Sequence, residues 1–165
     1  MCNLCDAALG DAAVTREQLD EWIKALRSGE YKQTNSQLVY KQLDGEVGYC
    51  CLGVYGRLNG GTEDLNQGWM TFEGTIDSAG ELEPQVAYIP NGIMTRLAQS
   101  FFAGLNDGQG LSFEEIANIA EKLPLRAFQD DNWWDEKSDY VNGVHLALKA
   151  FKIGRNNQPE EIEDL

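Results

Sequence analysis

Basic side chains are scarce in this sequence. Its 165 residues include 13 lysines and arginines against 27 aspartates and glutamates, which gives a formal net charge of −14 at pH 7. Nucleic-acid binding requires basic side chains that neutralise phosphates, and an anionic membrane surface would repel this chain for the same reason. The composition therefore argues against both as partners and suits either a partner protein with a basic surface or simply high solubility.

Long hydrophobic runs are also lacking. No segment approaches the roughly 18 consecutive apolar residues of a membrane span, and residues 1–6 lack the basic start and apolar run of a signal peptide. We therefore expect a cytoplasmic protein that does not associate with a membrane. Because thiols stay reduced in the cytosol, we expect that the four cysteines do not form a disulfide framework.

Recognised catalytic and nucleotide-binding motifs are missing. The sequence has no nucleophile elbow, HExxH, P-loop, dinucleotide fingerprint or EF-hand spacing. Its glycine-rich stretch at residues 104–110 follows a predicted helix and predicts a turn. The single histidine, His145, would serve a cysteine nucleophile only if the fold brought the two together. We expect no catalytic residues and no cofactor.

What the sequence contains is the composition of one globular domain. Apolar residues make up 42% and charged residues 24% of the chain, which is close to ordinary globular usage. A chain of this length can bury a sizeable core. We expect a single domain over residues 1–165, with mobile ends at residues 1–14 and 156–165.

The spacing of apolar residues predicts helices over residues 15–28, 50–58, 94–105, 113–123 and 138–152. Two of them begin with a capping box, in which Thr15 is paired with Gln18 and Ser112 with Glu115. The third and fourth helices follow each other closely, which predicts an αα-hairpin.

The favoured turn pair Asp44-Gly45 separates extended segments at residues 38–43 and 46–49, and together they predict a β-hairpin. Further short strands are expected at residues 69–72 and 85–89, where they would extend the sheet of the hairpin. The predicted fold is α+β and helix-rich, with a small antiparallel β-sheet or hairpin packed against four or five α-helices.

Cys50 and Cys51 stand where the predicted hairpin passes into a helix. Neighbouring side chains on a strand point to opposite faces, so the two thiols suit one metal ion poorly, and we expect small buried packing groups. Tyr49 and Cys51 would face one side of the strand and Cys50 the other. Gly53 and Gly56 indicate where a neighbour approaches the helix closely. The weaker alternative is a zinc site with the ligands Cys2, Cys5, Cys50 and Cys51.

Negative charge is concentrated where basic residues are missing. Residues 58–95 hold six acidic residues and no basic one, and further acids surround Trp133 and Trp134. Either one of these indoles is exposed as a contact for a partner protein, or both are buried. The candidate partner-binding residues are Glu63, Asp64, Glu73, Asp77, Glu81, Glu83, Asp130, Asp131, Trp133, Trp134, Asp135 and Glu136.

A small-molecule pocket is the alternative kind of site. Polar and aromatic side chains lie in and beside the predicted hairpin, and nearby basic residues would attract an anionic ligand such as a signalling nucleotide. The candidate ligand-binding residues are Arg27, Tyr31, Lys32, Gln33 and Tyr49.

Four blocks of the sequence carry a resemblance. They are WIKALRSGEYKQ at residues 22–33, GYCCLGV at 48–54, LND at 105–107 and SFEEIA at 112–117. Together they resemble a family of small, uncharacterised proteins of tailed bacteriophages, over roughly residues 19–123. Ile89-Pro90 stands where members carry Leu-Pro. Cys2 and Cys5 fall outside the family pattern, which weakens the zinc alternative, and the resemblance implies no particular activity.

Small phage proteins without catalytic motifs are often accessory factors, and this shapes three hypotheses. The first is a non-enzymatic counter-defence protein that imitates the charge of nucleic acid and inhibits a host defence or nucleic-acid-binding protein. The second is a protein that sequesters a small molecule or nucleotide signal. The third, with the least support, is a small enzyme of unknown type. A homo-oligomer stays open in each case.

Overall fold

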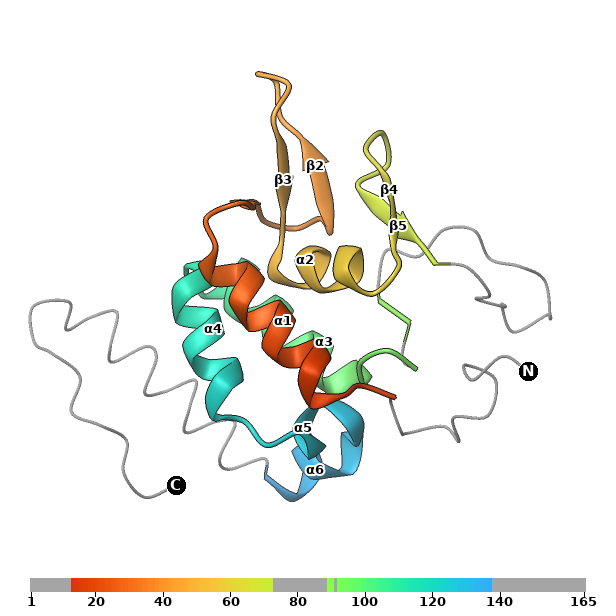
Figure 1. Cartoon of the computed structure of the whole chain (residues 1–165), viewed down its shortest axis with the longest axis vertical. Helices are drawn as coiled ribbons and strands as arrows, with labels where there is room; N and C mark the ends of the chain where they lie inside the picture. The colour runs from red at the N-terminus through yellow and green to blue at the C-terminus, as the bar shows by residue number, and fades with distance from the viewer. Residues whose placement is uncertain (1–12, 73–88, 91, 138–165) are drawn as a thin grey trace, which may run out of the picture.

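The computed structural model of the chain describes residues 13–72, 89–90 and 92–137. It shows a helix-rich α+β fold, as predicted, with two small sheets at one end of a group of helices (Figure 1). The helices are α1 (Arg16–Arg27), α2 (Cys51–Leu58), α3 (Arg96–Ala103), α4 (Phe113–Lys122), α5 (Arg126–Gln129) and α6 (Asp131–Glu136). A π-helical turn, η1 (Gly104–Gly108), directly follows α3. The strands are β1 (Lys32–Gln33), β2 (Val39–Lys41), β3 (Val47–Tyr49), β4 (Thr62–Asp64) and β5 (Trp69–Thr71).

Helix α1 forms as its sequence predicts and supplies the centre of the core. The Thr15 backbone N–H donates to Gln18 Oε1 at 2.9 Å, and Thr15 Oγ1 accepts from the Gln18 backbone N–H at 3.2 Å, so the predicted capping box is confirmed. The predicted apolar stripe is buried, and Trp22 is its central member. The Trp22 ring packs edge-on against Tyr55 of α2, Phe102 of α3 and Phe128 of α5. One side chain therefore joins four helices.

Helix α4 begins with the predicted capping box, formed by Ser112 and Glu115, but the predicted αα-hairpin is wrong. Helix α4 lies along α1 (Figure 1), and the residues of its apolar stripe are buried. Helix α3 instead packs with its aromatic face against α5 and α6, where Phe102 stacks on Phe128 at 5.5 Å and Phe101 contacts Trp134 at 4.8 Å. Sequence reasoning missed these two short helices, which pack against α3 where an αα-hairpin would have placed α4.

The predicted hairpin is confirmed, but its sheet is mixed rather than antiparallel. Central strand β3 pairs antiparallel with β2, with Val39 opposite Tyr49, and parallel with β1, with Gln33 opposite Tyr49. Two residues are too few to show the alternation that predicts a strand, so β1 was missed. Strands β4 and β5 form a separate two-stranded sheet and do not extend the first one.

Both glycines of α2 allow the close approach that the sequence indicates. A Cβ atom at Gly53 would lie 1.7 Å from the carbonyl oxygen of Leu38, and one at Gly56 would lie 2.8 Å from Met70 Sδ. The backbone before β2 and the β4–β5 sheet therefore rest directly on α2.

Other predictions fall near or beyond the limits of the described residues. Ala13 and Val14 were expected in a mobile end, yet Val14 is buried and the Ala13 N–H donates to the carbonyl oxygen of Gly92 at 2.9 Å. The predicted helix at 138–152 with His145, the segment 156–165 and most of the predicted strand at 85–89 lie outside the described residues. None of the helices in the described part has the length and apolar character needed to cross a membrane.

Candidate functional site

The two adjacent cysteines form the start of α2, and both are buried. Cys50 is the N-cap residue, and its Sγ accepts a hydrogen bond from the Gly53 backbone N–H at 3.3 Å. Cys51 is the first helical residue, and its thiol donates to the carbonyl oxygen of Phe102 at 3.5 Å. The predicted packing role is thus confirmed, but the side assignment is wrong. Because Cys51 already belongs to the helix, it does not share a strand face with Tyr49.

Burial disfavours the thiolate form of both cysteines. It raises the pKa of Cys50 from 9.0 to about 11, although the Gly53 N–H acts in the opposite direction. Burial also raises the pKa of Cys51 well above its ordinary value. A nucleophile or metal ligand must be a thiolate, so these environments favour packing over chemistry.

Asn106 lies at the centre of a buried polar network beside these thiols. Its side chain is fully buried, and its Oδ1 accepts from Gln33 Nε2 at 3.0 Å and from the Cys51 backbone N–H at 3.3 Å. Its Nδ2 donates to the carbonyl oxygen of Thr34 at 2.9 Å and to Asp107 Oδ1 at 2.7 Å. The wide turn of η1 directs this amide into the protein, and such π-helical turns are frequent at functional sites.

Gln33 extends the network to the start of α4. Its Nε2 also donates to the carbonyl oxygen of Leu111 at 2.7 Å, and its Oε1 accepts from the Phe113 N–H at 3.0 Å. We call the group of Gln33, Cys51, Asn106 and Asp107 the Asn106 junction. The four sequence blocks that carry the phage resemblance each contribute a residue to it or adjoin it, so tertiary structure brings these separate blocks together.

Sequence reasoning missed Asn106 because residues 104–110 were interpreted as a turn. The sequence did carry one signal, because Asn106 directly follows the apolar spacing that ends at Leu105. In the structure both residues are buried. A surface hollow beside the junction is lined by Gln33, Asn35, Gly110, Leu111, Ser112 and Glu115. The hydrogen-bonding groups of Gln33 are already used within the protein.

The predicted ligand-binding residues do not converge on one pocket. Tyr31 and Tyr49 meet edge-on at 5.3 Å, which agrees with their placement beside the hairpin. Lys32 instead forms ion pairs with Asp44 and Glu46 of the hairpin. Gln33 belongs to the Asn106 junction, and Arg27 faces α4. The structure therefore divides the five candidates among four different environments.

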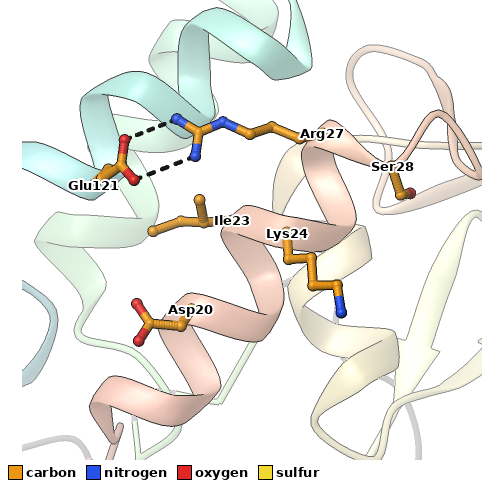
Figure 2. Close-up of a pocket in the computed structure, with 6 residues that line it drawn as sticks. All are labelled: Asp20, Ile23, Lys24, Arg27, Ser28 and Glu121. Carbon is orange, nitrogen blue, oxygen red and sulfur yellow. Dashed lines mark hydrogen bonds and ion pairs between the residues drawn. The ribbon is translucent and has the colours of Figure 1, made fainter.

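Arg27 lines a shallow hollow between α1 and α4, which Figure 2 shows. Its Nη2 lies 2.9 Å from Glu121 Oε2 and 2.6 Å from Asn118 Oδ1. The hydrogen bond with Glu121 raises the pKa of Arg27 and lowers the pKa of Glu121. Lys24 points away from this pair. The guanidinium group of Arg27 is already paired with Glu121 and Glu114 of the chain.

Glu63, a candidate partner-binding residue, joins three elements instead. It accepts from Tyr49 Oη of β3 at 2.6 Å and forms an ion pair with Arg57 of α2. Arg57 also lies over the Tyr49 ring, with 5.8 Å between the guanidinium carbon and the ring centroid. Burial is the main cause that raises the pKa of Tyr49 to about 12, and the hydrogen bond and negative charge of Glu63 act in the same direction. Glu63 thus holds β4 against β3 and α2.

Three more of the predicted acidic residues have local structural roles. Asp64 accepts from the N–H groups of the β4–β5 turn. Asp130 is the N-cap of α6, where the Asn132 N–H and then Arg126 lower its pKa. Asp131 accepts from the Leu97 N–H at 2.8 Å, at the start of α3. Asp135 and Glu136 are exposed, as expected, whereas Glu73, Asp77, Glu81 and Glu83 lie outside the described residues.

The two tryptophans are both buried, so the alternative of an exposed indole is wrong. Trp133 is 8% and Trp134 is 5% exposed. They lie on α6, where the two rings meet edge-on at 5.0 Å and Trp134 Nε1 donates to the carbonyl oxygen of Ala127 at 2.6 Å. Their role in the described structure is to pack α6 against the core.

Comparison with known proteins assigns part of the chain to a domain model. Residues 15–79 match a domain of unknown function, DUF8296. The matched segment includes α1, the mixed sheet, α2, Cys50, and the junction residues Gln33 and Cys51, and it ends before Asn106. No curated protein and no solved structure shows a significant match. Among the described residues, no three His, Cys, Asp or Glu side chains are grouped so that they could hold a metal ion; Cys2 and Cys5 lie outside them.

Proposed function

We propose that this protein is a phage accessory protein that inhibits a basic host protein by occupying its nucleic-acid-binding surface stoichiometrically. The observation that carries the proposal is the charge balance. The described residues hold sixteen acidic and ten basic side chains, and the whole chain has a net charge of −14. Such an excess of one sign steers a partner of opposite charge and accelerates association.

The distribution of ion pairs supports the same function. Of the five arginines in the described part, Arg16, Arg27, Arg57 and Arg126 are each paired with a carboxylate of the chain. Arginine is the side chain best suited to bidentate phosphate binding. Because these groups are already occupied, the arrangement supports a basic protein partner over a nucleotide ligand.

Three further exposed acids, which sequence reasoning missed, lie on α1 and just beyond its end. Glu17 and Glu21 are one turn apart on its exposed side, and Glu30 is exposed beyond the end of the helix. No ion pair is formed by these three residues within the described structure. Glu17 and Glu21 repel each other as like charges four residues apart, and because neither forms an ion pair with the described residues, their carboxylates are available to a partner. We call these three residues the α1 acidic surface.

A displacement assay tests the proposal. Purified bacterial DNA-binding proteins are loaded with a fluorescent DNA duplex, and the full chain is added at increasing salt. We expect one of them to release its duplex at a fixed stoichiometry, less readily as salt rises. The triple variant Glu17→Gln, Glu21→Gln, Glu30→Gln should associate more slowly and show a weaker salt dependence.

The matched control removes the opposite charge from the same region. The variant Lys24→Gln, Lys122→Gln changes exposed residues of α1 and α4 and should displace the duplex at least as well as the natural chain. If no member of the panel is displaced, or if displacement does not respond to salt, charge imitation is wrong.

A further inference from the structure

We propose that the tip of the β2–β3 hairpin, residues 42–46, is an apolar anchor that inserts Leu43 into a socket on the partner protein. This inference deepens the proposed function, since it assumes a protein partner. It assigns a specific contact in addition to the nonspecific attraction of the acidic surface. The hairpin extends away from the helices at the end of the molecule opposite α5 and α6 (Figure 1).

The tip is held in one conformation by hydrogen bonds and ion pairs. The Gly45 N–H donates to the carbonyl oxygen of Gln42 at 2.9 Å, and the Gln42 N–H donates to that of Glu46 at 2.7 Å. Gly45 has a φ of 86°, which favours glycine. Asp44 Oδ1 accepts from the Glu46 N–H at 2.9 Å, and Lys32 of β1 pairs with both acids. A binding element that is ordered in advance loses little entropy on binding.

The tip presents apolar surface that the fold does not use. Leu43 has a relative exposure of 105%, and Tyr40 on the same hairpin is 43% exposed. Among the described residues, the remaining exposed large apolar side chain is Leu58, at 38% on α2. Two of three such residues thus lie on one projecting hairpin, and Leu43 is the most exposed.

The charges at the tip and on the whole chain indicate the kind of partner. Lys32 and Lys41 balance Asp44 and Glu46 around Leu43, so the local contact should be apolar and insensitive to salt. A second copy of the chain would be repelled, because each copy carries −14, and acids beside Leu43 oppose insertion into an anionic membrane. The occupant is therefore another protein, with an apolar socket and a surface that is basic overall.

Photo-crosslinking from the tip tests this assignment. The full chain carrying p-benzoylphenylalanine at position 43 is irradiated in a bacterial lysate, with position 58 as the matched control. Unlabelled natural chain and Leu58→Ser should suppress the crosslink made from position 43, and Leu43→Ser should not. The crosslinked protein is then purified, and Leu43→Ser should weaken its affinity for the chain at least about tenfold, as expected for losing a buried leucine.

The outcomes separate the anchor from charge imitation. A tenfold loss with Leu43→Ser, an unchanged salt dependence and a basic captured protein support the anchor with its stated occupant. The same loss with a captured protein that is not basic keeps the apolar contact of Leu43 but overturns both the basic occupant and charge imitation. Absence of a position-specific crosslink, equal competition by Leu43→Ser, or equal affinity of that variant for the purified protein overturns the anchor. Two other results would also overturn the anchor. Co-sedimentation with anionic vesicles would show that the tip binds a membrane, and a dimer that Leu43→Ser dissociates would show that it binds a second copy of the chain.

Discussion

The base and the tip of the β2–β3 hairpin differ in burial: the base is packed against the rest of the protein, and the tip is exposed to solvent. At the base, β3 leads into α2 and the Asn106 junction, where backbone rests on Gly53 and polar groups are paired. No buried side-chain nitrogen or oxygen in the described part of the chain lacks a hydrogen-bond partner. At the tip, Leu43 is fully exposed and ion pairs at the surface hold the turn. Folding requirements therefore account for the residues at the base and leave the exposed leucine at the tip unexplained.

The largest effect is expected at Gly53. The variant Gly53→Ala places a Cβ atom 1.7 Å from the carbonyl oxygen of Leu38, and neither backbone segment can move without disturbing the hairpin base. We expect unfolding to become easier by about 4 kcal/mol or more, measured by denaturant titration.

Gly104→Ala is the matched control for that variant. Gly104 has helical dihedral angles and open space around its Cα, so alanine should change stability by no more than about 1 kcal/mol, in the stabilising direction. Equal tolerance of alanine at both positions would contradict the close contact between α2 and Leu38.

The second largest effect is expected from removing the amide at the junction. Asn106→Ala leaves the Cys51 N–H and the Thr34 carbonyl group without this partner inside the protein, and we expect a loss of about 3 kcal/mol. Asn118→Ala also removes an amide, but one that bonds Arg27 at the surface, and it should cost less than about 0.5 kcal/mol. Similar losses for both variants would show that the junction is not a special structural element.

Enlarging the buried thiol should have a smaller effect. Cys51 is fully buried against α3, and Cys51→Leu adds volume where the helix start meets Phe102. Overpacking should cost about 1–3 kcal/mol and lower the melting temperature in a thermal scan. An unchanged melting temperature would mean that the junction has room that its contacts do not indicate.

Alkaline pH should destabilise the protein through ionisation of the buried Cys50 thiol at the base of the hairpin. The folded protein keeps the Cys50 proton up to a pKa of about 11, whereas the unfolded chain loses it near 9.0. The stability from this thiol is therefore complete below pH 9 and falls as pH rises toward 11. Denaturant titrations between pH 8 and 10.5 should show that decline, and Cys50→Ala should reduce its slope. A profile with the same slope in both proteins would contradict the assignment to this thiol.

The smallest effect is expected at the tip. Because Leu43 is fully exposed, Leu43→Ser should leave the free energy of unfolding within about 0.5 kcal/mol of the natural value. A larger loss in denaturant titration would show that the leucine serves the fold, and it would remove the contrast between base and tip.

Much of the local structure was predictable because it depends on short-range spacing. The capping boxes at Thr15 and Ser112 and the apolar stripes of α1 and α4 are set within a few residues, so periodicity and capping rules identified them. Strand β1 and helices α5 and α6 were missed because they are too short for such patterns. The candidate site was less predictable: the acids at Glu63 and Asp131 carried no local sign that they would bind neighbouring elements.

The sequence by itself determined the helix-rich α+β class, the capped starts of α1 and α4, the hairpin turn and the surplus of negative charge, because these depend on composition and on neighbours along the chain. Only the tertiary structure decided that Asn106 meets Gln33 and Cys51, that both tryptophans are buried, and which carboxylates are used internally. Those outcomes depend on residues tens of positions apart, whose pairing is selected by the combined burial of apolar surface and the pairing of buried polar groups.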